Sequence, residues 1–201
     1  MRKKLVILGA GGHGRVCAEI ASMTGYEEIL FLDDGAPSDV SVSGKIEELE
    51  KYVPGFDVFV GVGNNGVRRA LFERAAAAGA DFATLIHPSA TVSPAASVGR
   101  GTVIVAGAVV NCGAVIGDGV IVNTCASVDH DCKIGDFTHI AVGAHVAGQA
   151  DVGEGCFFGA GSAVIQCVTV CAECVIGAGA AVVGDITERG TYVGVPARRV
   201  K

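Results

Sequence analysis

The chain of 201 residues has a formal net charge of −6, and 50% of its residues are hydrophobic against 18% that are charged. Without a clustered basic surface, this balance argues against a chain built for non-specific nucleic-acid binding. Thirty glycines and no tryptophan predict a core of small aliphatic side chains with frequent tight turns, and the length predicts two small domains.

The N-terminus places basic residues before a short apolar run, "MRKKLVIL". The run breaks into glycines without a cleavage-type segment, so it predicts a first β-strand and not a signal peptide. Glycine and polar residues interrupt every apolar stretch before it is long enough to span a bilayer. We therefore expect a cytoplasmic protein without membrane insertion.

Apolar runs alternate with helix-like segments along residues 1–85. The runs "KLVIL", "EILFLDD", "DVFVGVG" and "DFATLI" predict strands over 4–8, 28–34, 57–63 and 81–86. The segments between them predict helices over 15–25 and 66–79. This alternation is typical of a small parallel sheet of Rossmann type, and the prolines in "HPSATVSP" mark its border.

A glycine-rich turn, "GAGGHG" at residues 9–14, lies between the first strand and the first helix. Asp33 and Asp34 end the next strand about twenty residues later, as in dinucleotide-binding folds. Backbone N–H groups at such a turn approach a diphosphate, and a carboxylate accepts hydrogen bonds from sugar or base. The pattern favours a nucleotide, but it leaves open NAD, a nucleotide-sugar, or a tight turn without ligand. His13 is unusual for a dinucleotide site.

A second turn, "GVGNNGVRRA" at residues 61–70, ends the third strand and opens a helix. Because the carboxyl ends of parallel strands face the ligand crevice, the turn is expected to line that crevice. Its candidate lining residues are Gly63, Asn64, Asn65 and Arg68. Asn64 or Asn65 could equally cap the helix.

A period of six residues runs through the second half of the chain. Every sixth residue from Ile86 to Val182 is a large apolar residue, and the residue four positions after each is small or β-branched. A hexad period predicts a parallel β-helix with three hexads, or eighteen residues, in each coil. We expect residues 86–201 to form such a prism, with five to six coils.

Eight cysteines include the C-x-x-C sequence "CAEC" at 171–174. Cys132, Cys156 and Cys174 fall on the small inward position of the hexad, which predicts buried, reduced packing thiols. Cys171 and Cys174 differ in hexad phase, so we interpret their spacing as accidental and expect no metal.

The combination of "GAGGHG", "FLDD", "GNN", the hexads, "NTCASVDHD" and "GTYVGVPARRV" resembles the NeuD/PglD-like sugar acetyltransferase family. The resemblance covers essentially the whole chain. It implies a left-handed β-helix behind a Rossmann-like domain, and a homotrimer with acetyl-CoA between neighbouring prisms. It also implies N-acetylation of the 4-amino group of a UDP-linked deoxy-amino-sugar for bacterial glycan or protein glycosylation. O-acetylation of sialic acid and N-acetylation of a GDP-amino-sugar are the alternatives within this class.

The resemblance also implies roles for single residues. His130 is implied as general base, with Asp131 as its acidic partner. Relatives of PglD often carry glutamate at this second position, so the reach of the shorter Asp131 decides the hydrogen bond. The nucleotide-sugar positions are Gly11, Gly12, His13, Asp33, Asp34 and Gly63, with Asn123 near the sugar. The acetyl-CoA positions are His139, Gly148, Ala160 and Ala178.

Acetyl transfer to an amine needs a base to accept the amine's proton, and histidine titrates near neutral pH. Other interpretations of the histidines remain open. His130, His139 and His145 could hold zinc between subunits, as in γ-carbonic-anhydrase-type proteins, and the stretch 129–131 could be a solvated polar turn. An NAD-dependent oxidoreductase would use the glycine turn alone, and a non-catalytic trimeric scaffold would use the prism alone.

Overall fold

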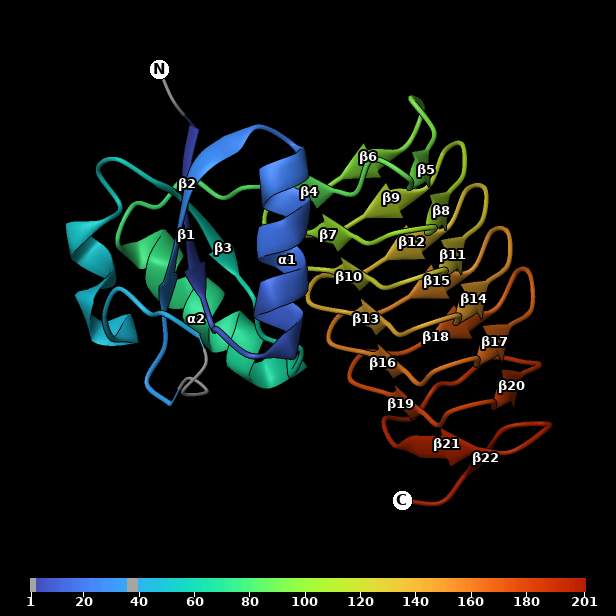
Figure 1. The fold of residues 1–201 in the computed structure, drawn as a ribbon. Coiled ribbons are helices and arrows are strands. Elements are labelled where there is room, and N and C mark those ends of the chain that lie inside the picture. Colours follow the sequence, from blue (N-terminus) through green and yellow to red (C-terminus); the bar gives the residue numbers. More distant parts are fainter. Residues whose placement is uncertain (1–2, 36–39) are drawn as a thin grey trace.

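The computed structural model describes residues 3–35 and 40–201. A small α/β unit lies beside a long stack of triangular coils (Figure 1). The stack is a left-handed parallel β-helix of about six turns. Within the described ranges, no helix combines the length and apolarity needed to cross a membrane.

The α/β unit contains a three-stranded parallel sheet with strand order β2-β1-β3. Its elements are β1 (Lys3–Leu8), α1 (Gly12–Met23), β2 (Tyr26–Leu32), the 3₁₀ helix η1 (Ile46–Lys51), β3 (Asp57–Val60) and α2 (Asn65–Ala77). The side chains of β1 from Leu5 to Leu8 are fully buried, as expected for a central strand covered on both faces. The first three predicted strands and both predicted helices of this half are therefore present, with small shifts at their ends.

The segment 81–86 does not form the fourth strand predicted for this sheet. Phe82 makes only an isolated bridge to Val58. Leu85–Ile86 (β4) instead pairs with Val103–Ile104 (β7) and is the first strand of the β-helix. The sequence prediction was wrong here because two-residue β-helix strands and the end of a longer apolar run look alike in one dimension.

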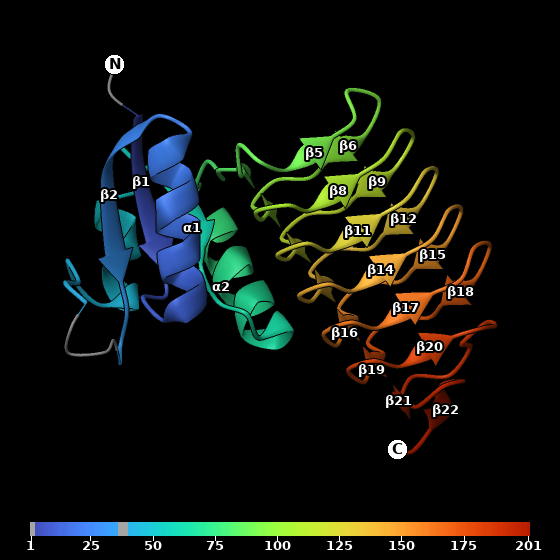
Figure 2. The same cartoon turned by 45° about the vertical axis from the view of Figure 1, so that its right-hand side comes forward.

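Three faces build the β-helix from stacked strands of mostly two residues (Figure 2). Face 1 contains β4, β7, β10 (Ile121–Val122), β13 (His139–Ile140), β16 (Phe157–Phe158), β19 (Val175–Ile176), β21 (Thr191–Val193) and β22 (Arg198–Arg199). Face 2 contains β5 (Thr91–Val92), β8 (Val109–Val110), β11 (Ser127–Val128), β14 (His145–Val146), β17 (Ala163–Val164) and β20 (Ala181–Val182). Face 3 contains β6 (Ser97–Val98), β9 (Val115–Ile116), β12 (Lys133–Ile134), β15 (Asp151–Val152) and β18 (Thr169–Val170). Partners on one face are eighteen residues apart, for example Ile121 and His139, which confirms the predicted coil.

The predicted hexad positions fill the core of the prism. From Ile104 to Val182 the large apolar residue of every hexad is at most 2% exposed, and it is always the second residue of its strand. The first residue of each strand therefore points outward. Cys132, Cys156 and Cys174 are fully buried free thiols on the small inward position, as predicted.

Each corner of the prism turns through one residue in the left-handed region. Positive φ values recur every six residues from 101 to 179, eight of them at glycine and six at other residues. Asp131 is one of the six, with φ 57°. Aspartate tolerates this conformation better than most side chains because it is short and polar. The corners are named here by the faces that they join: 1–2, 2–3 and 3–1.

The α/β unit packs on face 1 and on corner 3–1. Helix α1 covers the outward residues of the upper strands of face 1, so Leu85, Val103 and Ile121 are buried against Cys17 and other α1 residues. Helix α2 lies against corner 3–1, where Phe72 meets Phe137 edge to face. Below Ile121, the outward ladder of face 1 continues with His139, Phe157 and Val175, which the α/β unit leaves partly uncovered.

Candidate active site

His130 and Asp131 lie at corner 2–3, on the turn between β11 and β12. Nδ1 of His130 is 2.9 Å from Oδ2 of Asp131, and the two side chains are 49% and 59% exposed. The shorter aspartate therefore reaches the imidazole. Because the carboxylate accepts from Nδ1–H, the neutral ring carries its free lone pair on Nε2, where it can take a proton.

A second carboxylate fixes the backbone of this turn. Oδ1 of Asp129 accepts hydrogen bonds from the side-chain amide of Asn111 at 2.7 Å and from the N–H of His130 at 2.8 Å. These bonds hold the pKa of Asp129 below its usual value. The hydrogen bond that His130 donates to Asp131, aided by the negative charge of Asp129, raises the pKa of His130. The corner therefore presents a base that is stronger than an isolated histidine.

Gly148 lies one coil further along the same corner, directly against the His130 ring. A Cβ atom on Gly148 would lie 2.5 Å from Nε2 and 2.7 Å from Cε1 of His130. Real Cβ atoms do not approach other atoms so closely, so any side chain at 148 would displace the imidazole. Glycine at this position is therefore needed for the observed orientation of His130.

The glycine-rich turn at residues 9–14 contains glycines of two kinds. Gly9, Gly14 and Gly61 lie in close backbone contact where β1, β3 and the start of α1 meet. A Cβ atom added to Gly11 or Gly12 would instead meet no other atom within 4 Å. Gly9, Gly14 and Gly61 thus allow the elements of the α/β unit to pack closely. Gly11 and Gly12 leave open space in front of the N-terminus of α1, where a diphosphate could approach backbone N–H groups.

Asp33 and Asp34 follow β2, and both carboxylates already accept internal hydrogen bonds. Asp33 accepts from the N–H groups of Ala10 at 2.6 Å and Gly35 at 2.7 Å. Asp34 accepts from the N–H of Ile46 at 3.1 Å. Asp33 therefore fixes the glycine-rich turn from the neighbouring strand. Since a carboxylate offers about four acceptor positions, both can still receive a ribose or base donor.

His139 joins the two halves of the molecule through a directed chain of hydrogen bonds. The N–H of Thr124 donates to Oδ1 of Asn123, and the amide nitrogen of Asn123 lies 3.1 Å from Nε2 of His139. Nδ1 of His139 lies 3.3 Å from the carbonyl oxygen of Gly63. These partners assign a neutral ring that accepts at Nε2 and donates at Nδ1.

His13 lies beside His139, with ring centroids 6.4 Å apart. Burial, together with the positive charge of Arg68, lowers the pKa of each histidine to about 4. Both rings are therefore neutral near pH 7. Neutral rings bring no positive charge to this junction. Both nitrogens of His139 are already hydrogen-bonded, and Nε2 of His13 lies 3.6 Å from Sγ of Cys17.

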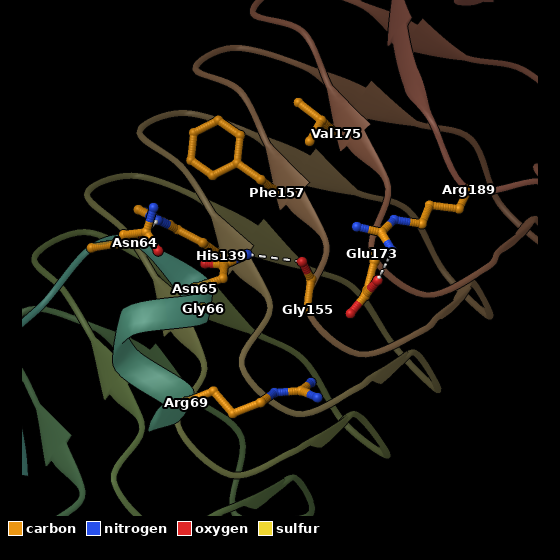
Figure 3. Close-up of a pocket in the computed structure, with 11 residues that line it drawn as sticks. Asn64, Asn65, Gly66, Arg69, His139, Gly155, Phe157, Glu173, Val175 and Arg189 are labelled. Atoms are coloured by element: carbon orange, nitrogen blue, oxygen red, sulfur yellow. Dashed lines mark hydrogen bonds and ion pairs between the residues drawn. The ribbon is translucent and has the colours of Figure 1, made fainter. Parts of the chain in front are cut away.

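A pocket of about 780 Å³ opens below His139, between the start of α2 and face 1 (Figure 3). Phe157 and Val175 form an apolar wall, and an ion pair of 2.5 Å between Arg189 and Glu173 lies on the opposite side. The residues that line it are Gly63, Asn64, Asn65, Gly66, Arg69, His139, Gly155, Phe157, Glu173, Val175 and Arg189. The sequence analysis missed Phe157 and Val175, although both occupy outward positions of face 1 that the hexad phase could have identified.

The turn at residues 61–70 is only partly as predicted. Gly63, Asn64 and Asn65 line the pocket, and Asn64 also caps α2 by accepting from the N–H of Val67 at 3.0 Å. Both interpretations of Asn64 therefore hold. Arg68 was predicted to line the crevice, and this is wrong: it is 1% exposed and lies inside the junction. Its position three residues into α2 turns it toward the β-helix and away from the crevice.

The candidate residues of one chain lie in three places. The glycine-rich turn, the aspartates, Gly63, Asn64, Asn123 and His139 surround the junction with face 1. His130, Asp131 and Gly148 lie at corner 2–3, and the exposed residues Ala160 and Ala178 lie at corner 1–2. His130 lies at corner 2–3, between faces 2 and 3, whereas His139 and Gly63 lie at face 1, so one chain does not bring His130 to the junction.

The three histidines considered as zinc ligands are also separated. His139 lies on face 1, His145 on face 2 beside Ser127, and His130 at corner 2–3. Over residues 3–35 and 40–201, no group of three or more His, Cys, Asp or Glu side chains has the geometry of a metal site. A single chain therefore does not assemble the set that the zinc hypothesis needs.

Comparison with known proteins supports the likeness seen in the sequence. Residues 4–75 match the PglD N-terminal domain family. The chain is 39% identical over 107 residues to UDP-N-acetylbacillosamine N-acetyltransferase of Bacillus subtilis (strain 168). That match spans 49% of this chain and 50% of that relative, so the chain covers about half the length of this curated protein.

Two solved structures match along the whole chain. The acetyltransferase domain of PglB from Neisseria gonorrhoeae FA1090, in complex with acetyl coenzyme A, is 46% identical with a TM-score of 0.94, and the match covers 100% of both chains. PerB from Caulobacter crescentus, in complex with CoA and GDP-perosamine, is 36% identical with a TM-score of 0.92, and the match covers 100% of this chain and 99% of that one. The chain belongs to the NeuD/PglD-like family of sugar N-acetyltransferases.

Proposed function

We propose that this protein is a cytoplasmic N-acetyltransferase that moves the acetyl group of acetyl-CoA to the 4-amino group of a UDP-linked deoxy-amino-sugar. The observation that carries the proposal is the His130–Asp131 pair, an exposed and oriented base at an open corner of the prism. The acetyl coenzyme A complex of the PglB domain supports the acyl donor. The name of the Bacillus subtilis relative supports a UDP-amino-sugar as acceptor.

In this reaction the neutral amine attacks the thioester carbonyl carbon, and a C–N bond forms as the carbonyl oxygen becomes an oxyanion. Nε2 of His130 takes the amine proton, while Asp131 holds Nδ1–H and stabilises the imidazolium. The tetrahedral intermediate then expels CoA as thiolate, which takes the proton. Among the described residues, none accepts a hydrogen bond from the N–H of Gly148, and we propose this group as an oxyanion donor.

Binding roles follow the open surfaces of the molecule. Gly11, Gly12 and the start of α1 are proposed to receive the diphosphate, with Asp33 and Asp34 on the ribose and base side. His13, Gly63, Asn64 and Asn123 are proposed to surround the sugar. His139, Gly148, Ala160 and Ala178 are proposed to contact acetyl-CoA, the last three through main-chain surface at corners 2–3 and 1–2.

We further propose that the working enzyme is a homotrimer whose sites lie between chains. The separation of His130, at corner 2–3, from His139 and Gly63, at face 1, supports this arrangement. A neighbouring copy that places its corner 2–3 beside corner 1–2 of this chain would bring the base to the sugar. Small residues at the outer surface, such as Ala163 and Ala181 on face 2, leave room for close packing of such copies.

Turnover of acetyl-CoA, monitored by thiol release, tests the activity with UDP-4-amino-sugars, GDP-4-amino-sugars and free sialic acid. Preference for the UDP-amino-sugar is expected. Faster turnover of the GDP-amino-sugar would favour the PerB-like alternative, since that relative's complex contains GDP-perosamine. Turnover of sialic acid alone would overturn the amine assignment.

Mixing two inactive variants tests the shared site. His130→Ala and His139→Ala chains carrying different tags are co-expressed, and oligomers containing both tags are purified. Each chain has one defect, so sites within single chains stay inactive, whereas a site between chains is intact in part of the mixed oligomers. Recovery of a measurable fraction of wild-type activity is expected. No recovery in doubly tagged oligomers would contradict an intersubunit site.

A further inference from the structure

Arg68 is a buried cation at the centre of the junction between the α/β unit and the β-helix. It projects from the first turn of α2 and is 1% exposed. Its guanidinium donates to the carbonyl oxygens of Gly119 (2.7 Å), Phe137 (2.7 Å), Gly63 (3.1 Å) and Val62 (3.2 Å), and to Oδ1 of Asn65 (2.9 Å). Among the residues that the structure describes, no carboxylate bonds to it. Oxygen dipoles alone balance its charge.

Such an arrangement is demanding. Burial lowers the pKa of Arg68 to about 10, so the side chain is still charged at neutral pH. A buried charge is costly unless hydrogen bonds satisfy it, and an apolar side chain would join two surfaces more cheaply. The planar fork of arginine instead fixes several partners at defined angles. Arg68 therefore fixes the geometry of the junction.

The partners of Arg68 belong to the two halves of the proposed site. Val62 and Gly63 form the turn at the end of β3, whereas Gly119 and Phe137 are left-handed corner residues of two successive coils. His139 follows Phe137 by two residues. The carbonyl oxygen of Gly63 accepts both from Arg68 at 3.1 Å and from Nδ1 of His139 at 3.3 Å. Arg68 and His139 are thus linked through one oxygen atom.

We propose that Arg68 is a positioning residue, which sets the distance and angle between the nucleotide-sugar turn at Gly63 and His139 on face 1. The proposal rests on the proposed acetyl transfer, because it assigns Gly63 to the nucleotide-sugar and His139 to acetyl-CoA. Arg68 does not contact a substrate in this role. It acts through the carbonyl oxygens that it holds, above all that of Gly63, whereas the His139 ring is held on face 1 by its hydrogen bond with Asn123.

Two further residues of α2, Asn65 and Arg69, contact the β-helix at the same junction. The side-chain amide of Asn65 donates to the carbonyl oxygens of Gly155 (3.0 Å) and Cys156 (2.9 Å), one coil beyond Phe137. Arg69 pairs with Glu154 at 3.1 Å and stacks over the Phe137 ring. These contacts can hold α2 on the β-helix when Arg68 is changed. A variant at 68 is therefore expected to fold with a loosened turn at Gly63.

Arg68→Lys and Arg68→Met test the proposal, with Arg74→Met on the exposed last turn of α2 as matched control. Lysine keeps the charge but cannot hold five partners, and methionine removes the charge. In both variants the KM for the nucleotide-sugar is expected to rise by about 10-fold to 100-fold, and the KM for acetyl-CoA to stay within about twofold. Calorimetric binding of the nucleotide-sugar without acetyl-CoA should weaken by the same factor. The Arg74 variant should match wild type.

A purely structural role predicts a different pattern. Equal changes in both KM values, or a lower unfolding temperature with unchanged KM values, would overturn the positioning role. If Arg68→Met fails to fold, the lysine variant decides. If the wild-type chain turns over no amino-sugar, the proposed function fails. Hydrogen exchange then still tests whether Arg68 holds the turn at Gly63 against the β-helix. Arg68→Lys should then speed exchange at residues 61–65 and 137–141 and leave 160–180 unchanged; uniform exchange across these segments would reject the proposal.

Discussion

Nδ1 of His130 lies 2.9 Å from Oδ2 of Asp131, its neighbour in the chain, and this contact depends on the left-handed conformation of Asp131. Adjacent residues in an extended strand point to opposite sides. At the corner, the positive φ of 57° turns the aspartate back toward the histidine that precedes it. The fold thus builds a hydrogen-bonded histidine–aspartate pair from two consecutive residues, at a position where the hexad demands no core packing.

Replacement of His130 by alanine removes the proposed base. The rate of acetyl transfer is expected to fall by about 10²–10⁴-fold, the usual contribution of general-base catalysis. Binding of acetyl-CoA, measured by calorimetry, should change little because the corner backbone is kept. His87→Ala, in the first coil and hydrogen-bonded to Ser89, is the control and should keep most of the activity. Full activity in His130→Ala would contradict the assignment.

Asp131→Asn is expected to shift the pH dependence of kcat/KM. In the proposed reaction the active base is neutral His130, so activity should be lost on the acid side as the ring is protonated. Because the Asp131 hydrogen bond raises the pKa of His130, its removal lowers that pKa and moves the acid limb to lower pH. Asparagine also tolerates the left-handed conformation, so the turn should persist. An acid limb at the wild-type position would show that Asp131 does not tune the base.

Gly148→Ala is expected to displace the His130 ring, because the added Cβ would lie 2.5 Å from Nε2. Gly184 occupies the same position of corner 2–3 two coils further on, and nothing lies within 4 Å of a Cβ there. Gly184→Ala is therefore the matched control. The rate of acetyl transfer should fall by about 10-fold or more in Gly148→Ala and remain near wild type in the control. Equal rates in the two variants would contradict the contact.

Two buried hydroxyl groups in the β-helix are predicted to have opposite effects on stability when they are removed. Ser162 is fully buried, and its hydroxyl group has no hydrogen-bond partner among the described residues. Alanine occupies the equivalent position one coil before it, at Ala144, and one coil after it, at Ala180. Thr138, which precedes β13 on face 1, instead donates to the carbonyl oxygen of Gly153 (3.0 Å) and accepts from the N–H of Cys156 (3.1 Å).

Chemical denaturation should separate the two cases. Ser162→Ala is expected to raise the free energy of unfolding by about 1 kcal/mol, because it removes a buried unpaired hydroxyl. Thr138→Ala should lower it by about 1–3 kcal/mol, because it leaves two backbone groups without their partner. Destabilisation by both variants to the same extent would show that packing volume dominates at these positions.

The sequence by itself determined the architecture of the second half, because a hexad period is a local pattern that repeats. Each coil pairs with the next at eighteen residues, so the phase of a residue settles whether it is buried, as for Val128 and Cys132. By the same phase, His130 and Asp131 fall between the inward positions and take no part in core packing. Family resemblance implied the roles proposed for them, and the glycine-rich turn predicted a nucleotide site.

Only the tertiary structure decided how the two halves meet. The burial of Arg68, the tautomer of His139 and the pocket beside Phe157 all depend on α2 lying against face 1 and corner 3–1. Residues such as Arg68 and Phe137 are 69 positions apart, and no local period connects them. Whether Asp131 reaches His130 was likewise decided by one backbone angle at a corner, which side-chain spacing alone cannot fix.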